Sequence, residues 1–217
     1  MAEATSSGVM TAELSEEAET PVPTITAGAI LPPMDDASGI GQRVVVTGLA
    51  GSGKSTFSRA LATKTGLPII YLDLLFWKPG WVAPTDAEWG EKQRQALAGE
   101  SWIADGNYHE TLDLRLERAD TIVVLDMPWP LCAVRALGRG LRDSGGEMPQ
   151  GCEDSAWRRL RDEWQIAGRT CRKRGTEPAL EREIIARHGQ HADLHVLRSK
   201  REANEFLERV RSREPTD

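Results

Sequence analysis

The sequence contains the run Gly48-Leu49-Ala50-Gly51-Ser52-Gly53-Lys54-Ser55-Thr56, which fits the pattern G-x-x-x-x-G-K-[ST] of a phosphate-binding loop. The β-branched residues 43–47 precede this run, as expected for a buried parallel strand. Residues 53–64 follow it with the apolar spacing of a helix. Because strand, loop and helix come in the required order, the sequence predicts a P-loop.

The residue types of this loop suit a nucleotide and Mg²⁺. Its glycines let backbone N–H groups turn toward phosphate oxygens, and the N-terminus of the following helix adds partial positive charge. The Lys54 ammonium can reach the β- and γ-phosphates, and the Ser55 hydroxyl can bind Mg²⁺, whereas the spacing of Thr56 is wrong for that role. The residues expected to bind ATP are Gly48, Gly51, Ser52, Gly53, Lys54, Ser55 and Thr56.

Charge is distributed unevenly along the 217 residues. Residues 1–40 hold seven acidic side chains and no lysine or arginine, and removing these from the net charge of −6 leaves +1 for residues 41–217. Because the first segment shows no sustained apolar periodicity, we interpret residues 1–40 as a disordered acidic tail and residues 41–217 as one domain. A near-neutral domain argues against direct nucleic-acid binding.

The cysteines Cys132, Cys152 and Cys171 are widely separated and form no C-x-x-C pair, which argues against a zinc site and against a disulfide framework. No apolar run approaches the length of a membrane span, and the N-terminus lacks the features of a signal peptide. We therefore expect a cytoplasmic protein without a membrane partner. Nothing in the sequence indicates an oligomeric state.

Strand and helix patterns alternate after the P-loop, which predicts an α/β fold: a three-layer P-loop NTPase with a five-stranded parallel sheet. Acidic residues stand at the ends of three expected strands, namely Asp73, Asp105 and Asp126. Ligands bind at the carboxyl ends of such strands. We therefore expect these carboxylates to meet the P-loop in one crevice.

Three short patterns resemble those of adenylate kinases: Trp102-Ile103-Ala104-Asp105-Gly106, Asp126-Met127-Pro128 and Arg135-Ala136-Leu137-Gly138-Arg139. Others resemble the small P-loop kinase-like proteins of the "topology modulation protein" group: Leu72-Asp73, Trp77-Lys78-Pro79-Gly80-Trp81, Asp105-Gly106-Asn107-Tyr108, Gly151-Cys152-Glu153 and Leu197-Arg198-Ser199-Lys200. The resemblance covers about residues 42–210. It implies a nucleoside monophosphate kinase-like fold with a small helical lid, at about residues 139–175.

The resemblance also implies roles for individual side chains. Lys54 and Ser55 match the phosphate and Mg²⁺ contacts, and Asp105 matches an acid that holds Mg²⁺, usually through water. Arg135 and Arg139 match arginines that flank the adenine and the phosphates. From the arginine-rich segment that follows, we select as a further nucleotide-binding residue of the lid Arg169.

One departure from adenylate kinases concerns the acceptor. Those enzymes carry arginines at the positions of Phe76 and His109, where they bind the phosphate of AMP. This chain is therefore not expected to use AMP, unless the phosphate is met by Lys78, Arg115 or Arg118. Asp73 suits a neutral hydroxylated acceptor better, because its carboxylate can take the hydroxyl proton.

Each of these residues has an alternative interpretation. Asp105 could cap the helix that follows it, and Asp73 could simply form a turn. Asp126 has the look of a Walker B acid, but Met-Pro follows it, and we treat it as a structural residue or as one that supports the metal site indirectly. Arg135 and Arg139 share one helical face, which favours an anion between them over a solvated basic face. The aromatic residues that could stack on a planar ligand, but fit a core better, are Trp77, Trp81 and Tyr108.

The predicted function is a Mg²⁺-dependent transfer of the γ-phosphoryl group from ATP to a small acceptor, a nucleotide or a hydroxylated metabolite. The residues expected to carry the catalysis are Lys54, Asp73, Arg135 and Arg139. The alternative is an ATP-binding regulatory protein that affects DNA topology with little or no turnover.

Overall fold

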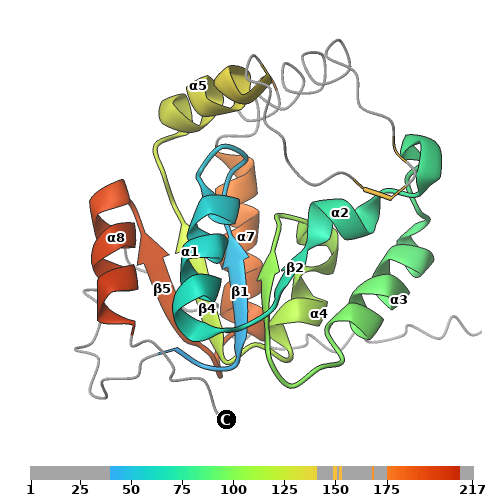
Figure 1. Ribbon diagram of the computed structural model, residues 1–217, viewed down its shortest axis with the longest axis horizontal. Coiled ribbons are helices and arrows are strands. Elements are labelled where there is room, and N and C mark those ends of the chain that lie inside the picture. The colour runs from blue at the N-terminus through green and yellow to red at the C-terminus, as the bar shows by residue number, and fades with distance from the viewer. Residues whose placement is uncertain (1–39, 141–148, 151, 153–167, 169–174, 211–217) are drawn as a thin grey trace, which may run out of the picture.

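The computed structural model describes residues 40–140, 149–150, 152, 168 and 175–210 (Figure 1). All but the last residue of the acidic tail predicted for residues 1–40 lies outside these ranges, as do most of the lid predicted for about residues 139–175 and Arg169. The last residue, Ile40, is buried in the core. The side chain of Arg139 is likewise outside the description.

Five strands form one parallel sheet in the order β2-β3-β1-β4-β5. Their bounds are Arg43–Thr47 (β1), Ile69–Tyr71 (β2), Trp102–Asp105 (β3), Thr121–Leu125 (β4) and Asp193–Leu197 (β5). Asp105 pairs with Val46 on one side and with Tyr71 on the other, so three strands end at the same level. The α/β fold with a five-stranded parallel sheet is confirmed. We call the two ends of the sheet its carboxyl edge and its amino edge.

Helices connect these strands. They are Lys54–Thr65 (α1), Leu72–Phe76 (α2), Asp86–Ala96 (α3), Leu112–Leu116 (α4), Trp129–Gly140 (α5), Thr176–His188 (α7) and Lys200–Arg209 (α8). The short 3₁₀ turns Pro79–Trp81 and His109–Thr111 precede α3 and α4. Figure 1 shows α5 beyond the carboxyl edge, on the same side of the molecule as the P-loop.

The side chains of β1 alternate between two apolar layers. Val44 and Val46 pack with Phe57 of α1 and Phe206 of α8, whereas Val45 belongs to the layer beneath α4 and α7. This period of two residues is the consequence of a pleated strand that is buried on both faces. Helices therefore cover both sides of the sheet, as a three-layer architecture requires.

The second strand ends earlier than the sequence suggested. We expected a strand up to Asp73, but β2 ends at Tyr71 and Asp73 lies in the first turn of α2. Leu72, Leu75 and Phe76 have the i, i+3, i+4 spacing of an apolar helical face, and the Leu72 side chain is fully buried. An acid in the first turn is favourable because it faces the positive end of the helix dipole.

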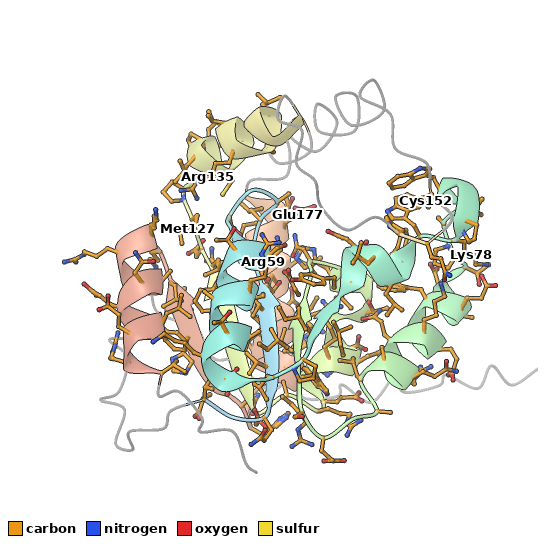
Figure 2. The ribbon with its side chains drawn as sticks, in the orientation of Figure 1. Arg59, Lys78, Met127, Arg135, Cys152 and Glu177 are labelled. Atoms are coloured by element: carbon orange, nitrogen blue, oxygen red, sulfur yellow. The ribbon has the colours of Figure 1, made fainter. Side chains whose placement is uncertain are left out.

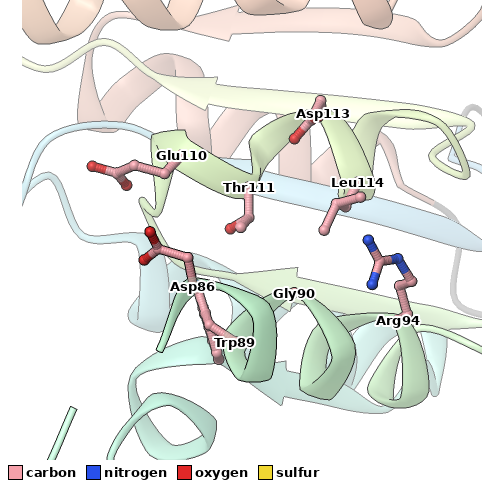
Figure 3. Close-up of a pocket in the computed structure, with 8 residues that line it drawn as sticks. All are labelled: Asp86, Trp89, Gly90, Arg94, Glu110, Thr111, Asp113 and Leu114. Atoms are coloured by element: carbon pink, nitrogen blue, oxygen red, sulfur yellow. The ribbon is translucent and has the colours of Figure 1, made fainter. Parts of the chain in front are cut away.

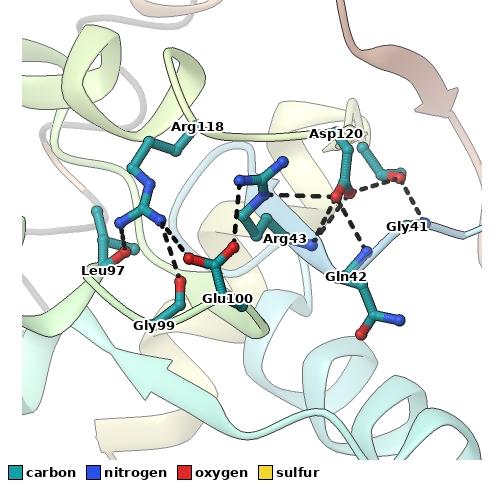
Figure 4. Close-up of polar contacts among 9 residues, drawn as sticks. Gly41, Gln42, Arg43, Leu97, Gly99, Glu100, Arg118 and Asp120 are labelled. Carbon is teal, nitrogen blue, oxygen red and sulfur yellow. Dashed lines mark hydrogen bonds and ion pairs between the residues drawn. The ribbon is translucent and has the colours of Figure 1, made fainter.

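Asp120 links segments of the amino edge through hydrogen bonds and an ion pair (Figure 4). Its carboxylate accepts hydrogen bonds from the backbone N–H groups of Gln42 and Arg43 and lies 3.6 Å from the Arg43 Nε. Glu100 bridges Arg43 and Arg118 at 4.0 and 3.6 Å. Arg118 also donates to the carbonyl oxygens of Leu97 and Gly99. We call this set the amino-edge clamp: Arg43, Glu100, Arg118 and Asp120.

Candidate functional site

The P-loop at the carboxyl edge has a backbone that only glycine accommodates at two positions. Gly48 and Gly51 have φ angles of 131° and 83°, in the region that favours glycine. A Cβ on Gly51 would lie 2.2 Å from the Cys132 carbonyl oxygen, and one on Gly48 would lie 2.5 Å from that of Leu125. The loop is therefore packed against β4 and the first turn of α5.

The loop presents polar groups suited to an anion. The N-terminus of α1 has no acidic residue in its first turn and no side-chain cap, so its N–H groups can face a phosphate. The buried Ser52 Oγ has no hydrogen-bond partner among the described residues. Lys54 Nζ donates to the carbonyl oxygens of Gly48 and Leu49 at 2.8 and 3.1 Å, so it lies across the loop. These groups fit a nucleotide phosphate chain.

Ser55 and Asp105 come together as the sequence predicted. The Ser55 hydroxyl hydrogen-bonds the Asp105 carboxyl, which is only 4% exposed. Burial raises the pKa of Asp105, while the hydrogen bond from Ser55 and the charge of Lys54 act in the opposite direction. A hydroxyl and a carboxylate are hard oxygen ligands, the kind that Mg²⁺ uses together with water and substrate phosphates. The described residues contain no cluster of three acidic, histidine or cysteine side chains that could form an all-protein metal cage.

Asp73 lies near this pair, and its negative charge also raises the pKa of Asp105. The Asp73 side chain is exposed, and its Oδ1 accepts a hydrogen bond of 3.0 Å from the Tyr108 hydroxyl. Burial and the neighbouring Asp73 raise the pKa of Tyr108, so its hydroxyl stays protonated at neutral pH. Asp73 therefore faces solvent at the carboxyl edge with one oxygen already held.

Aromatic side chains surround Tyr108. The ring of Phe76 stacks on that of Tyr108, with 4.9 Å between the ring centroids. The Trp89 ring also lies 4.9 Å from the Tyr108 ring. Trp77 contacts Phe76 at 5.0 Å and Trp81 at 5.6 Å. We call these five residues the aromatic cluster. Their edge and stacking contacts show that Trp77, Trp81 and Tyr108 pack with one another, although only Trp89 of the cluster is buried and the other rings remain partly exposed.

The backbone beside Trp81 is unusual. Trp81 has a φ of 64° and is the one non-glycine residue in the described ranges with a positive φ. Lys78 and Val82 form a β-bridge around this turn, and Cys152 Sγ lies 3.4 Å from the Lys78 carbonyl oxygen (Figure 2). The turn thus holds a bulky side chain in a backbone region that costs of order 1–3 kcal/mol.

Arg135 projects from α5 at the P-loop end of the molecule (Figure 2) and is exposed. Its charge and that of Lys54 both lower the pKa of Cys132, whose pKa burial raises, so both cations lie near the first turn of α5. Asp126 instead pairs with Arg198, with 3.8 Å between Oδ2 and Nε. This pairing fits the structural role expected for Asp126.

The cations named as replacements for an AMP-binding arginine have other partners. Lys78 pairs with Glu88 at 2.7 Å, and Arg118 belongs to the amino-edge clamp. Arg115 is 1% exposed and donates to Gln93 Oε1 and to the Tyr108 carbonyl oxygen. Arg59 of α1, which sequence reasoning overlooked, is exposed and exerts its charge on Asp105.

Glu181 of α7 was also missed from the sequence. It is 5% exposed, and its carboxyl contacts the hydroxyl of Thr47, the last residue of β1. Burial raises the pKa of Glu181, against the favourable charges of His109 and Lys54. No local pattern could have revealed it, because α7 is remote from the P-loop in sequence and Glu181 reads as one of several helical glutamates.

A groove of about 300 Å³ lies between α3 and α4 (Figure 3), and Asp86 and Glu110 flank it. Its lining includes no P-loop residue and neither Asp73 nor Asp105. Trp89 belongs both to this lining and to the aromatic cluster, so the groove lies behind the cluster and not at the phosphate-binding loop. No helix in the described part of the chain is long and apolar enough to cross a bilayer.

No protein-family profile matches the chain, and no curated protein sequence does. Among solved structures, the chain is similar to a shikimate kinase from Acinetobacter baumannii in complex with shikimate, at 14% identity and a TM-score of 0.47, covering 78% of this chain and 90% of that one. It is also similar to a gluconokinase from Sinorhizobium meliloti 1021, at 21% identity and a TM-score of 0.40, covering 78% and 93%. A putative kinase from Chloroflexus aurantiacus matches at 17% identity and a TM-score of 0.44, covering 78% and 97%. At these values the likeness does not extend to the substrate of this chain.

Proposed function

We propose that the chain is a Mg²⁺-dependent phosphotransferase that moves the γ-phosphoryl group of ATP to a hydroxyl of a small acceptor without a phosphate group. The observation that carries this proposal is the arrangement of the carboxyl edge. The hydroxyl–carboxylate pair Ser55–Asp105 lies beside the phosphate-binding loop, and the exposed carboxylate of Asp73 lies near enough to Asp105 for its charge to raise the pKa of that residue. A metal-binding pair and a proton acceptor at one strand end are the parts that phosphoryl transfer to a hydroxyl requires.

The nucleotide half rests on the P-loop. Lys54 would leave the carbonyl oxygens of Gly48 and Leu49 for the β- and γ-phosphates, and the N-terminus of α1 would face the phosphate chain. Ser55 and Asp105 would hold Mg²⁺, which supplies charge neutralisation at the phosphates. Arg135, Arg139 and Arg169 are proposed to flank the nucleotide.

The acceptor half rests on charge. Asp73 and Asp105 make this region negative, and the electrostatic contacts that bear on Asp105 come from the cations Lys54 and Arg59. The dianionic phosphate of AMP would add close to two negative charges there. A neutral hydroxyl adds none and offers Asp73 a proton. This argument favours a hydroxylated metabolite over a nucleoside monophosphate.

In the proposed reaction the acceptor oxygen attacks the γ-phosphorus, and a new P–O bond forms as the bond to the β-phosphate oxygen breaks. ADP leaves, and the hydroxyl proton passes to the Asp73 carboxylate. The chain contributes by positioning the two reactants and by placing positive charge near the transferring group.

A screen of ATP turnover against hydroxylated acceptors, with AMP as a parallel arm, tests this proposal. We expect Mg²⁺-dependent ADP formation with at least one sugar, polyol or hydroxy acid, and with AMP no more than in the ATP-only control. Asp73→Asn should weaken transfer more than ATP binding. Rapid, stoichiometric ADP formation from ATP and AMP would refute the acceptor assignment.

A further inference from the structure

The Tyr108 ring packs against two other aromatic rings. Its centroid lies 4.9 Å from that of Phe76, with the rings stacked at 30°, and 4.9 Å from that of Trp89, tilted at 58°. Phe76 and Trp89 also contact each other at 5.1 Å, so the three rings form a triangle. Contact with two aromatic neighbours restrains the Tyr108 ring and with it the position of its hydroxyl.

The backbone of Tyr108 is held separately. Arg115 donates from its Nη2 to the Tyr108 carbonyl oxygen at 3.0 Å and from its Nη1 to Gln93 Oε1 at 2.9 Å. Gln93 is itself fully buried and donates to Thr111 Oγ1 at 2.6 Å. Burial of the guanidinium lowers the pKa of Arg115 to about 10, so the fold places a desolvated cation there. These hydrogen bonds hold the backbone of the loop that follows β3, although burying the Arg115 charge costs free energy.

The Tyr108 hydroxyl donates a hydrogen bond to Asp73 Oδ1. Asp73 is 35 residues away in the sequence and is exposed on α2. The contact therefore joins a rigid, largely buried platform to a solvent-facing carboxylate.

We propose that Tyr108 is the positioning residue for Asp73: its hydroxyl occupies Oδ1 and leaves Oδ2 directed at the acceptor hydroxyl. This inference rests on the proposed function, because it assumes that Asp73 receives the acceptor proton. A carboxylate with one oxygen held needs less reorganisation when the proton moves. Tyr108 does not touch the reacting atoms itself.

Tyr108→Phe tests the kinetic part, because it keeps the ring packed against Phe76 and Trp89 and removes only the hydroxyl. With an acceptor found in the screen, we expect kcat to fall roughly tenfold to a hundredfold, the loss of one hydrogen bond to a charged group, while KM for ATP stays unchanged. Tyr71→Phe, at the end of β2, is the matched control and should behave as the original chain.

The double variant decides between positioning and packing. If Tyr108 acts through Asp73, then Tyr108→Phe should add little to Asp73→Asn, because the two changes remove the same interaction. Unchanged kcat in Tyr108→Phe overturns the proposal, as do effects of the two substitutions that multiply.

A titration tests the contact without any turnover, which separates this inference from the proposed function. The chain has two tyrosines, so in Tyr71→Phe the only phenol is that of Tyr108. Adding Asp73→Asn should make tyrosinate absorbance appear at lower pH, because the neighbouring negative charge is removed. Adding Asp193→Asn instead, at the start of β5, should leave the onset unchanged. If tyrosinate absorbance appears at the same pH in the Asp73 and Asp193 variants, the positioning role is overturned, even if the chain proves to be a kinase. If the Asp73 variant shifts the onset but the chain shows no turnover, the contact stands and the proposed function is refuted.

Discussion

The two edges of the sheet carry charged side chains in opposite conditions. At the amino edge, Arg43 and Asp120 are each about one-third exposed, and Glu100 is 88% exposed between two arginines. At the carboxyl edge, Asp105 and Glu181 are 4% and 5% exposed, and burial raises the pKa of both.

The comparison indicates that the charged side chains of the amino edge stabilise the fold, whereas those of the carboxyl edge form the candidate site. The amino-edge clamp joins β1 to the turn before β4 with solvated charges and backbone hydrogen bonds, so its partners suffice without a ligand. The carboxyl edge keeps two acids in surroundings that disfavour their charged forms, a condition that a bound cation would relieve. Perturbed carboxyls of this kind cluster at functional sites.

The largest expected effect is at the carboxyl edge. Lys54→Ala should lower nucleotide turnover by roughly 10²–10³-fold, because it removes a charge from the transferring phosphate. The melting temperature should change little, since the Lys54 hydrogen bonds to the Gly48 and Leu49 carbonyl oxygens lie within the loop itself. Lys64→Ala, in the last turn of the same helix, is the control and should retain full turnover. If the Lys54→Ala chain is as active as the original, the assignment of the P-loop to the site is wrong.

Asp105→Asn should weaken Mg²⁺-dependent ATP binding by about tenfold or more, the usual range for changing a residue that supports a metal. The fold should not suffer, because the amide carries no charge that burial opposes. Calorimetric titration with and without Mg²⁺ measures this. Asp126→Asn is the matched control, since Asp126 pairs with Arg198. Equal losses in the two variants would contradict the assignment of Asp105.

Asp120→Ala should lower the free energy of unfolding by about 2 kcal/mol, because the backbone N–H groups of Gln42 and Arg43 lose their acceptor. Turnover of the remaining folded protein should be unchanged. Glu100→Ala should cost less than about 1 kcal/mol, since an exposed ion pair contributes little. Denaturant unfolding measures both. A larger loss for Glu100→Ala would mean that the clamp acts through its ion pairs.

The smallest expected effect concerns pH and Glu181. Its pKa is raised in the folded chain, so the unfolded chain loses this proton first as pH rises, and folding stability falls as pH rises through the folded-state pKa. Glu181→Gln lacks this loss and can still accept a hydrogen bond from Thr47. Its unfolding free energy, relative to the original chain, should therefore increase with pH. Glu183→Gln, exposed on the same helix, should show no such trend, and a parallel pH profile for Glu181→Gln would contradict the burial argument.

Much of the fold was predictable because its signals are local. The P-loop has a fixed pattern, the buried strands are β-branched, and a capping box of Thr85 and Glu88 marks the start of α3. The sequence predicted Asp73 at the end of a strand, whereas it lies in the first turn of α2. A five-residue helix has too few turns for its apolar spacing to be recognised in the sequence.

The candidate site was predictable only where it follows strand ends. Ser55 and Asp105 are drawn together by a parallel sheet whose strand ends are level, which sequence patterns already imply. Glu181, Arg115 and the Tyr108–Asp73 hydrogen bond depend on how α7, α4 and α2 pack against those ends. Packing over such separations leaves no trace in local spacing, so these contacts required the structure.

The close approach of Gly51 to the Cys132 carbonyl oxygen has a mechanical consequence. A side chain on residue 51 would have to displace either the phosphate loop or the first turn of α5. The shape of the phosphate loop therefore depends on the position of a helix that lies far from it in the sequence.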